Sequence, residues 1–196
     1  MRTALLFAAV IAVGAAIGIG LKQASSESDS AIPAPRKTSA DEMRRRLAGS
    51  PAPLAALHAQ AGELLPGGRG AWRARLRALR GHPAVVNVWA SWCGPCRQET
   101  PVLQEVSLDR GREVAFIGVN LRDDAGAARR FLRRAPVSYP SYEDPDGRIY
   151  NDYGLAGAPA TIFYDARGRK AYTHQGPYLS TADLERDIAR YAGGAG

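Results

Sequence analysis

The residues best suited to chemistry in this sequence are its two cysteines, Cys93 and Cys96. They stand in the segment Trp92-Cys93-Gly94-Pro95-Cys96, with two residues between them. Such a pair can cycle between a dithiol and a disulfide, because one thiolate attacks a disulfide and the second thiol then displaces the mixed disulfide that results. Two cysteines are too few for a disulfide-scaffolded fold or a four-cysteine zinc site.

The residues around the pair favour this exchange over a passive crosslink. A short β-branched run at residues 84–89 predicts a buried strand before the pair, and residues 93–108 predict a helix. At the start of that helix, free backbone amides and the helix dipole would stabilise a thiolate on Cys93. Cys96 would lie one turn in and be less exposed, and Pro95 suits a first turn that needs no amide donor. We therefore expect Cys93 to attack and Cys96 to resolve.

Two other interpretations of the cysteines carry less weight. A passive disulfide would not explain why the only two cysteines lie together at a helix start. A zinc site would need further ligands, and the three histidines His58, His82 and His174 are isolated in the sequence, with no spacing that pairs them. The sequence accordingly predicts no metal ion and no cofactor.

The elements that must position the cysteines alternate between helices and strands. The apolar periodicity predicts an α/β fold with a central mixed sheet flanked by helices. A loop is expected after Pro136, and a short turn at residues 165–168 separates the last two strands. The expected helices are 72–80, 93–108, 123–134, 148–153 and 181–191, with Asp123 and Asp124 as candidate caps of the third, and the expected strands are 84–89, 113–120, 160–164 and 169–174.

The N-terminal part of the chain differs from the rest. Residues 4–21 carry no charge and are long enough to span a bilayer, which favours a single-pass membrane anchor over a cleaved signal peptide. We assign residues 1–22 to this anchor or signal segment, with membrane contact through residues 3–21. Residues 23–53 follow as a flexible linker with a possible short helix near residues 41–47, and residues 54–196 form the folded domain, expected to be extracytoplasmic.

The overall composition is that of an ordinary globular protein. Hydrophobic residues make up 45% of the chain and charged residues 23%, which excludes wholesale disorder and a multi-span membrane protein. The net charge is +7, but the arginines are scattered along the chain. Because nucleic-acid binding requires a basic patch, we expect no nucleic-acid partner.

Several motifs together resemble the thioredoxin superfamily, and within it the membrane-anchored TlpA/ResA/DsbE-like thiol-disulfide oxidoreductases. The resemblance covers roughly residues 81–191. It rests on the segment 86–99, which reads Val-Asn-Val-Trp-Ala-Ser-Trp-Cys-Gly-Pro-Cys-Arg-Gln-Glu, on Pro101, on Asp144-Pro145-Asp146-Gly147, and on Tyr153-Gly154-Leu155-Ala156-Gly157-Ala158-Pro159-Ala160-Thr161. One stretch departs from the family: where relatives often carry a strand pair and a Gly-Lys turn, residues 70–80 here predict a helix.

The resemblance implies a thioredoxin-like fold in which a cis peptide bond precedes Pro159 and faces the cysteines. There the backbone of Ala158 would present itself to an incoming substrate, beside a substrate-binding surface made by Trp92, Gly94 and Pro95. Without the cysteines, Pro159 would be an ordinary loop proline. Trp89 is expected to pack in the core.

The resemblance also bears on the proton acceptor for Cys96. Typical thioredoxins carry a buried aspartate six residues before the first cysteine, but here the position is Asn87, which cannot titrate. Glu99 lies three residues after Cys96, where TlpA/ResA-like proteins place an active-site glutamate. Burial would raise its pKa and suit it to accept the proton of Cys96, although spacing alone fits a solvated glutamate equally well. Asp144 and Asp152 are other carboxylates that could approach in space.

The function that these features predict is an extracytoplasmic thiol-disulfide oxidoreductase. The Gly-Pro pair resembles that of reducing thioredoxins, which favours a reductase of exported cysteine-containing proteins. The resemblance implies recharging by a membrane thiol carrier and clients such as apocytochrome c. The alternative is a copper-binding metallochaperone, because thiolates suit Cu(I), but such relatives usually separate their cysteines by three residues. A peroxidase is disfavoured, since the peroxiredoxin cysteine pattern is missing.

Overall fold

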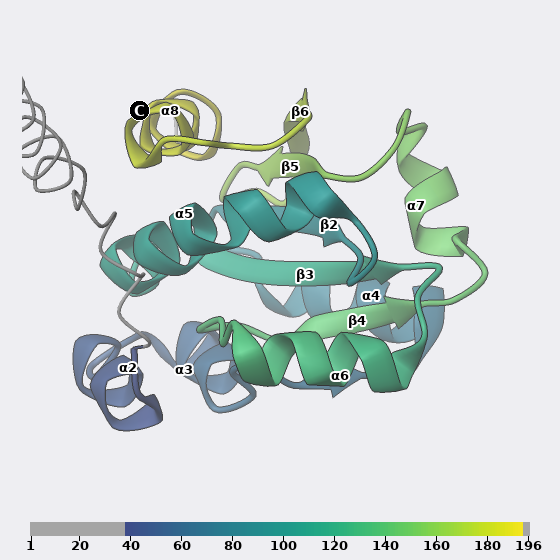
Figure 1. Ribbon diagram of the computed structural model, residues 1–196. Helices are drawn as coiled ribbons and strands as arrows, with labels where there is room; N and C mark the ends of the chain where they lie inside the picture. Colours follow the sequence, from purple (N-terminus) through teal and green to yellow (C-terminus); the bar gives the residue numbers. More distant parts are fainter. Residues whose placement is uncertain (1–37, 194–196) are drawn as a thin grey trace, which may run out of the picture. The chain divides into compact units, whose positions relative to one another are not determined.

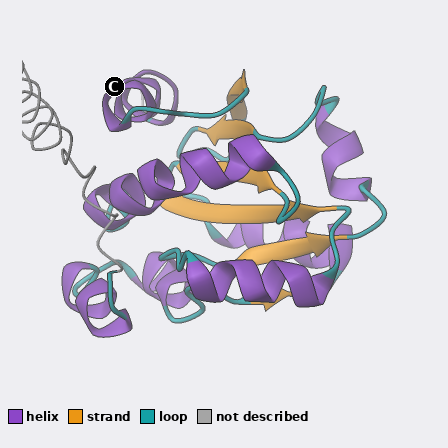
Figure 2. Ribbon diagram, in the orientation of Figure 1, coloured by secondary structure: helices purple, strands orange, loops and turns teal. Residues whose placement is uncertain are grey.

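The computed structural model describes residues 38–193, which form a six-stranded sheet covered by helices on both faces (Figures 1 and 2). The strand order is β1-β4-β3-β2-β5-β6. The first four strands in this order pair in parallel, and β5 and β6 are added antiparallel. The strands are β1 (Leu64–Leu65), β2 (Ala84–Trp89), β3 (Ala115–Leu121), β4 (Ser141–Asp144), β5 (Ala160–Tyr164) and β6 (Lys170–Gln175).

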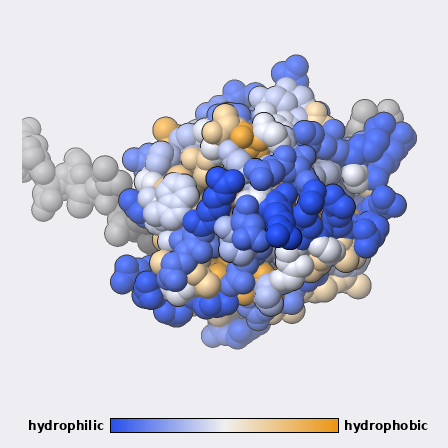
Figure 3. Space-filling view, turned by 90° about the vertical axis from the view of Figure 1, so that its right-hand side faces the viewer, coloured by the Kyte–Doolittle hydropathy of each residue, from blue (hydrophilic) through white to orange (hydrophobic). Residues whose placement is uncertain are grey.

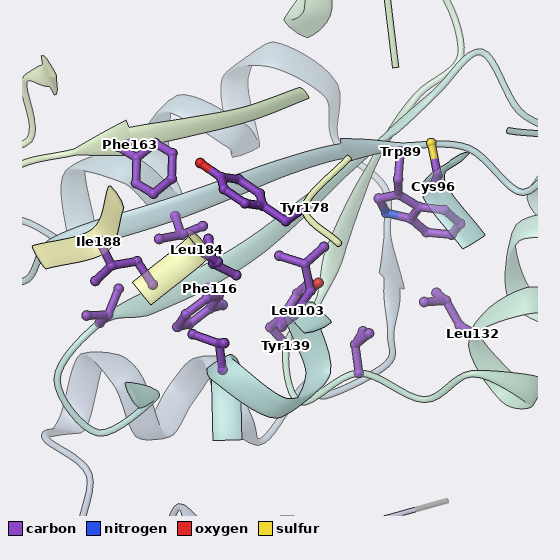
Figure 4. Packing of buried hydrophobic residues seen from close by; sticks show 14 of the residues in the cluster. Trp89, Cys96, Leu103, Phe116, Leu132, Tyr139, Phe163, Tyr178, Leu184 and Ile188 are labelled. Carbon is purple, nitrogen blue, oxygen red and sulfur yellow. The ribbon is translucent and has the colours of Figure 1, made fainter. Parts of the chain in front are cut away.

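The helices bury one apolar cluster on each face of the sheet. Helices α5, α6 and α8 cover one face, and α3, α4 and α7 cover the other. Figure 4 shows part of the first cluster, in which Trp89 and Cys96 are buried together with residues of α8. The bounds are α2 (Ala40–Arg46), α3 (Ala52–His58), α4 (Gly68–Ala78), α5 (Gly94–Arg110), α6 (Ala125–Arg134), α7 (Arg148–Tyr153) and α8 (Thr181–Asp187), which continues as the π-helical η1 (Ile188–Ala192).

The expected α/β architecture with a mixed sheet is confirmed. Strands β2 and β3 are buried along their whole length, since both faces of a central parallel pair are covered by helices. Their apolar runs made them recognisable in the sequence. The helix predicted before β2 is present as α4, although it begins at Gly68 instead of residue 72. Helix α6 begins two residues later than predicted, because Asp124 caps it by accepting the amide of Ala127 at 2.7 Å.

Strands β1 and β4 were not predicted. The sequence after Pro136 indicated a loop, but Ser141–Asp144 pairs in parallel with β3 and lies largely buried. This strand contains serine, glutamate and aspartate, so it lacks the apolar pattern of a central strand. Its buried serine finds a hydrogen-bond partner on another strand: Ser141 Oγ accepts the indole Nε1–H of Trp89, the last residue of β2, at 3.0 Å. Tertiary pairing therefore determines this strand more than its own sequence does.

Helix α2 lies within the range that the sequence assigned to a flexible linker, residues 23–53. It matches the short helix expected near residues 41–47. Met43 and Leu47 are buried against Leu108 near the end of α5, and Arg46 forms an ion pair with Asp109. The stretch from α2 onward is thus packed against the domain, unlike a freely flexible tether.

The predicted membrane anchor, residues 3–21, and the first part of the predicted linker lie outside the described residues. Within residues 38–193, none of the helices is both long enough and apolar enough to span a bilayer.

Gly118 in β3 allows a close approach that generates a stability prediction. A Cβ at this position would lie 2.9 Å from Trp89 Nε1 and equally close to Ser141 Cβ, with Ser141 Oγ closer still. We expect Gly118→Ala to lower the free energy of unfolding by about 1–3 kcal/mol, because β3 and β4 would have to separate. Urea unfolding of the oxidised protein measures this change.

The matched control is Gly70→Ala in α4, where an added Cβ meets nothing within 4 Å. Alanine favours a helix over glycine, so this variant should gain up to about 1 kcal/mol. Equal effects of the two substitutions would contradict the steric explanation.

Candidate active site

Cys93 and Cys96 form a disulfide at the junction between β2 and α5. The sulfur atoms are 2.06 Å apart and the Cα atoms 5.3 Å. Cys93 is the N-cap residue of α5, and its Sγ accepts the backbone N–H of Cys96 at 3.2 Å. The same amide can donate to a thiolate when the disulfide is open, so the helix start would stabilise a thiolate on Cys93.

The Ala158–Pro159 peptide bond is cis and faces the disulfide, as the resemblance predicted. The carbonyl oxygen of Ala158 lies 3.6 Å from Cys93 Sγ. The carbonyl of Pro159 accepts the amide of Gly176 at 3.0 Å, which ties this loop to the end of β6. The segment before β5 therefore presents backbone polar groups beside the reactive sulfur.

Both cysteines are covered in the oxidised protein. The exposed fraction is 4% for Cys93 and 2% for Cys96. Cys96 is the less exposed of the two, as predicted, but the difference is slight and Cys93 is not open to solvent. The exposed groups are its neighbours Trp92, at 59%, and Pro95, while Gly94 is half-buried. The surface next to the buried Cys93 is therefore made by these residues.

Glu99 is completely buried one helical turn after Cys96. Its carboxylate accepts the side-chain amide of Asn87 at 2.7 Å and the backbone N–H of Tyr178 at 3.3 Å. Burial raises the pKa of Glu99 to about 7, and the two hydrogen bonds oppose that rise. Because residues three apart on a helix lie on the same side, Glu99 and Cys96 share the inner side of α5. Asn87 thus holds the carboxylate of Glu99, from the position where thioredoxins carry an aspartate.

The other candidate carboxylates are engaged elsewhere. Asp144 accepts the amides of Ile149 and Tyr150 at the start of α7. Asp152 forms ion pairs with Arg69 and Arg73 of α4. These contacts leave Glu99 as the carboxylate that the fold brings to the interior beside the cysteines.

The two tryptophans near the cysteines have separate positions. Trp89 is 5% exposed and its ring lies 5.2 Å from that of Phe131, so it packs in the core as expected. Trp92 lies at the rim, where its indole Nε1–H donates to the carbonyl of Arg122 at 3.2 Å.

Asp123 holds the loop that leads from β2 to Cys93, a role that the sequence did not predict. Its carboxylate accepts the backbone N–H of Ser91 at 2.5 Å, the Ser91 hydroxyl at 2.7 Å and the Asn120 side-chain amide at 2.9 Å. The sequence offered Asp123 and Asp124 together as caps of α6, but only Asp124 has that role. The two adjacent acids gave no signal that one of them reaches across to a loop 32 residues away.

No group of three or more histidine, cysteine, aspartate or glutamate side chains within residues 38–193 is arranged to hold a metal ion. His174 stacks on Tyr178, with the ring centroids 4.2 Å apart. His58 lies beside Gly111, and its pKa is lowered by burial.

The fold and the site together define a thioredoxin-like protein with a redox-capable cysteine pair. The Redoxin family pattern matches residues 48–188, and the chain belongs to this family. Two relatives are thiol:disulfide interchange proteins named DsbE. The protein from Pseudomonas fluorescens biotype C is 44% identical over 91 residues, covering 46% of this chain and 49% of the relative. That from Allochromatium vinosum is 38% identical over 120 residues, covering 59% and 65%. The match thus spans about half to two thirds of the length of these relatives.

Solved structures agree with this assignment. A structure described as a putative thiol:disulfide interchange protein DsbE from Chlorobium tepidum is 30% identical with a TM-score of 0.55, covering 59% of this chain and 83% of that chain. A secreted Mycobacterium tuberculosis disulfide oxidoreductase is 31% identical with a TM-score of 0.53, covering 58% and 85%. The chain is therefore a thioredoxin-superfamily protein related to the DsbE group.

The three hydrogen bonds of Asp123 generate a coupling prediction. Ser91→Ala and Asp123→Ala should each lower the free energy of unfolding, but the double variant should lose about 1 kcal/mol less than the sum, because both single changes remove the same bond, the one from the Ser91 hydroxyl to Asp123. Urea unfolding of the four oxidised proteins gives this coupling energy. Ser91→Ala combined with Asp124→Ala is the matched control and should be additive. Additivity in both cycles would show that the bond between the Ser91 hydroxyl and Asp123 does not stabilise the fold.

The buried carboxyl of Glu99 generates a pH prediction. Its pKa rises from 4.5 to about 7 on folding, so the folded state binds this proton more tightly than the unfolded chain. The free energy of unfolding should therefore fall as pH rises from about 4.5 to about 7, by on the order of 3 kcal/mol, and stay level above. Glu99→Gln should remove this decline. Denaturant unfolding of the oxidised proteins across this range measures it, and parallel pH profiles for both proteins would refute the assignment.

Proposed function

We propose that this protein is a thiol-disulfide oxidoreductase that exchanges disulfides with other proteins through Cys93 and Cys96. The observation that carries the proposal is the position of the cysteine pair at the start of α5, facing the cis Ala158–Pro159 bond. Membership of the Redoxin family and similarity to thiol:disulfide interchange proteins support the same activity.

The reaction begins from the reduced pair. The Cys93 thiolate attacks one sulfur of a client disulfide, forms a mixed disulfide and releases the other client sulfur as a thiolate. Cys96 then loses its proton and attacks Cys93 Sγ, which closes the protein's own disulfide and releases the second client thiolate. Two electrons pass from the protein to the client, and an external dithiol must return them before the next cycle.

Glu99 serves the second step as the proton acceptor. A carboxyl group with a pKa of about 7 can take the Cys96 proton and lose it again near neutral pH. Cys96 is 2% exposed and Glu99 is completely buried, so a proton acceptor within the protein serves this side of the pair better than bulk solvent. Asn87 keeps the acceptor oriented through its 2.7 Å hydrogen bond.

The direction of the reaction is toward reduction of exported proteins. The Gly94-Pro95 pair between the cysteines matches the reducing members of the superfamily. The relatives include a thiol:disulfide interchange protein named CycY, from Rhizobium leguminosarum bv. viciae. This likeness supports a place in cytochrome c maturation, with apocytochrome c among the clients and a membrane thiol carrier as the electron donor.

The setting of the reaction is the outer side of the cell membrane. The uncharged run of residues 4–21 supports a single-pass anchor, with the domain extracytoplasmic. A secreted relative of known structure is consistent with an exported domain.

A trapping experiment tests the activity. Cys96→Ser keeps the attacking thiol and removes the resolving one, so this full-length variant should accumulate mixed disulfides with a peptide disulfide. Cys93→Ser is the control and should trap none, because the thiolate-stabilising position at the start of α5 belongs to Cys93 and not to Cys96. Non-reducing gels and mass spectrometry of the adducts measure both. Equal trapping by the two variants would overturn the assignment, and failure of the wild type to reduce any disulfide would overturn the function.

A further inference from the structure

Two arginines flank the loop that carries Cys93. Arg97, in the first turns of α5, reaches back over this loop: its Nη1 donates to the carbonyl of Ser91 at 3.0 Å. Its Nη2 lies 3.8 Å from the place a Cβ on Gly94 would occupy. The guanidinium group therefore lies against residues on both sides of Trp92 and Cys93, and its side chain is exposed.

Arg122 approaches the loop from the end of β3. Its backbone has a positive φ of 44°, unusual for a residue with a side chain, and its carbonyl accepts the Trp92 indole N–H. The guanidinium group lies over the ring of Tyr150, 5.8 Å from its centroid, and close to Gly147. Trp92 is thus in contact with a residue whose exposed positive charge lies on the α7 side of the site.

Arg97 and Arg122 are not neutralised by a direct ion pair. In the described part of the chain, neither guanidinium has a carboxylate within ion-pair distance, although eleven such pairs involve other arginines. Among the nearby acids, Asp124 faces Arg130 and Asp146 faces Arg148. Asp123 accepts from the neutral groups of Ser91 and Asn120, so it keeps its negative charge and offsets one of the two positive charges at the loop.

The surface at this end of the molecule agrees with a polar docking face. The carboxyl ends of β2 and β3 point toward the right-hand side of Figure 1, and Figure 3 turns that side to the viewer. Hydrophilic side chains gather at its centre, with apolar ones in smaller groups around them. The exposed Trp92 adds one aromatic contact beside the arginines. A client segment that docks here contacts the indole ring of Trp92 and the guanidinium groups of Arg97 and Arg122.

We propose that Arg97 and Arg122 form a specificity rim that selects protein clients with aspartate or glutamate residues next to the target cysteine. This inference rests on the proposed oxidoreductase function and names the kind of segment that the same site prefers. The rim acts on encounter and docking, while the bond-forming steps remain those of the two cysteines.

The size of the effect follows from Coulomb's law in water. A client with a carboxylate about 8 Å from both guanidinium groups and from Asp123 meets a net charge of about one, so it would react about twofold faster than a neutral client. A lysine in the same place would be slower by a similar factor. Salt should erase these differences, because the Debye length falls from about 30 Å at about 10 mM to about 3 Å at about 1 M.

The test uses the full-length reduced protein in neutral detergent and three peptide disulfides that differ only in the residues beside the cysteine: glutamate, glutamine or lysine. We expect the rate constants to fall in this order at about 10 mM salt and to converge at about 1 M. The double variant Arg97→Gln/Arg122→Gln should lose this order, because the charge left beside the loop is the negative one of Asp123. Arg97→Lys/Arg122→Lys should restore the order, which separates charge from the structural role of the Ser91 hydrogen bond.

The matched control is Arg133→Gln/Arg134→Gln, which removes the same charge from exposed positions in the last turn of α6. This variant should keep the wild-type order. Equal rates for the three peptides with the wild type, or an unchanged order in Arg97→Gln/Arg122→Gln, would overturn the specificity rim while leaving the oxidoreductase function intact. If no peptide, including the neutral one, were reduced, the proposed function itself would fail and the specificity rim with it.

Discussion

The structure of this site depends on a carboxyl group that is completely buried one helical turn after a disulfide. Burying such a group is costly unless its oxygens find donors, and here the donors are the amide of Asn87 and the backbone of Tyr178. These two residues come from β2 and from the segment before α8, so the carboxylate of Glu99 joins three parts of the fold. The remaining cost appears as a pKa raised to about 7, which is the property that the proposed proton transfer from Cys96 requires.

Typical thioredoxins carry the buried acid on the strand before the cysteines. Here Asn87 occupies that strand position, and the buried acid is Glu99 on α5. An acid on β2 would be fixed by the sheet, whereas Glu99 shares α5 with both cysteines. Its relation to Cys96 is therefore set by the helix geometry, and the strand contributes a neutral amide that orients it. On β5, the cross-strand neighbour of Asn87 is Thr161, which lies two residues after the cis proline. The residue that binds Glu99 is therefore paired with the strand that follows the segment facing Cys93.

Most of the fold could be predicted because its central elements are dictated by burial. The runs that became β2, β3 and β5 are apolar on both faces, and helix starts such as Asp124 follow local capping rules. β4 could not be predicted, because Ser141–Asp144 becomes a strand only by pairing with β3.

The candidate site divides in the same way between local and long-range features. The cysteines and the expectation about Glu99 came from spacing and family resemblance. The contact between Asp123 and Ser91, and the surroundings of Arg97 and Arg122, depend on which loops the topology brings together. No local pattern encodes those neighbours.

The packing of α2 on the far end of α5 has a consequence for how the cysteines are presented. Met43 and Leu47 meet α5 near Leu108, whereas the cysteines lie at its first turn. A helix of 17 residues is about 25 Å long, so α5 acts as a rigid spacer between the entry of the chain into the domain and the reactive sulfur. Contacts made at Met43 and Leu47 therefore lie about one length of α5 away from the sulfur atoms.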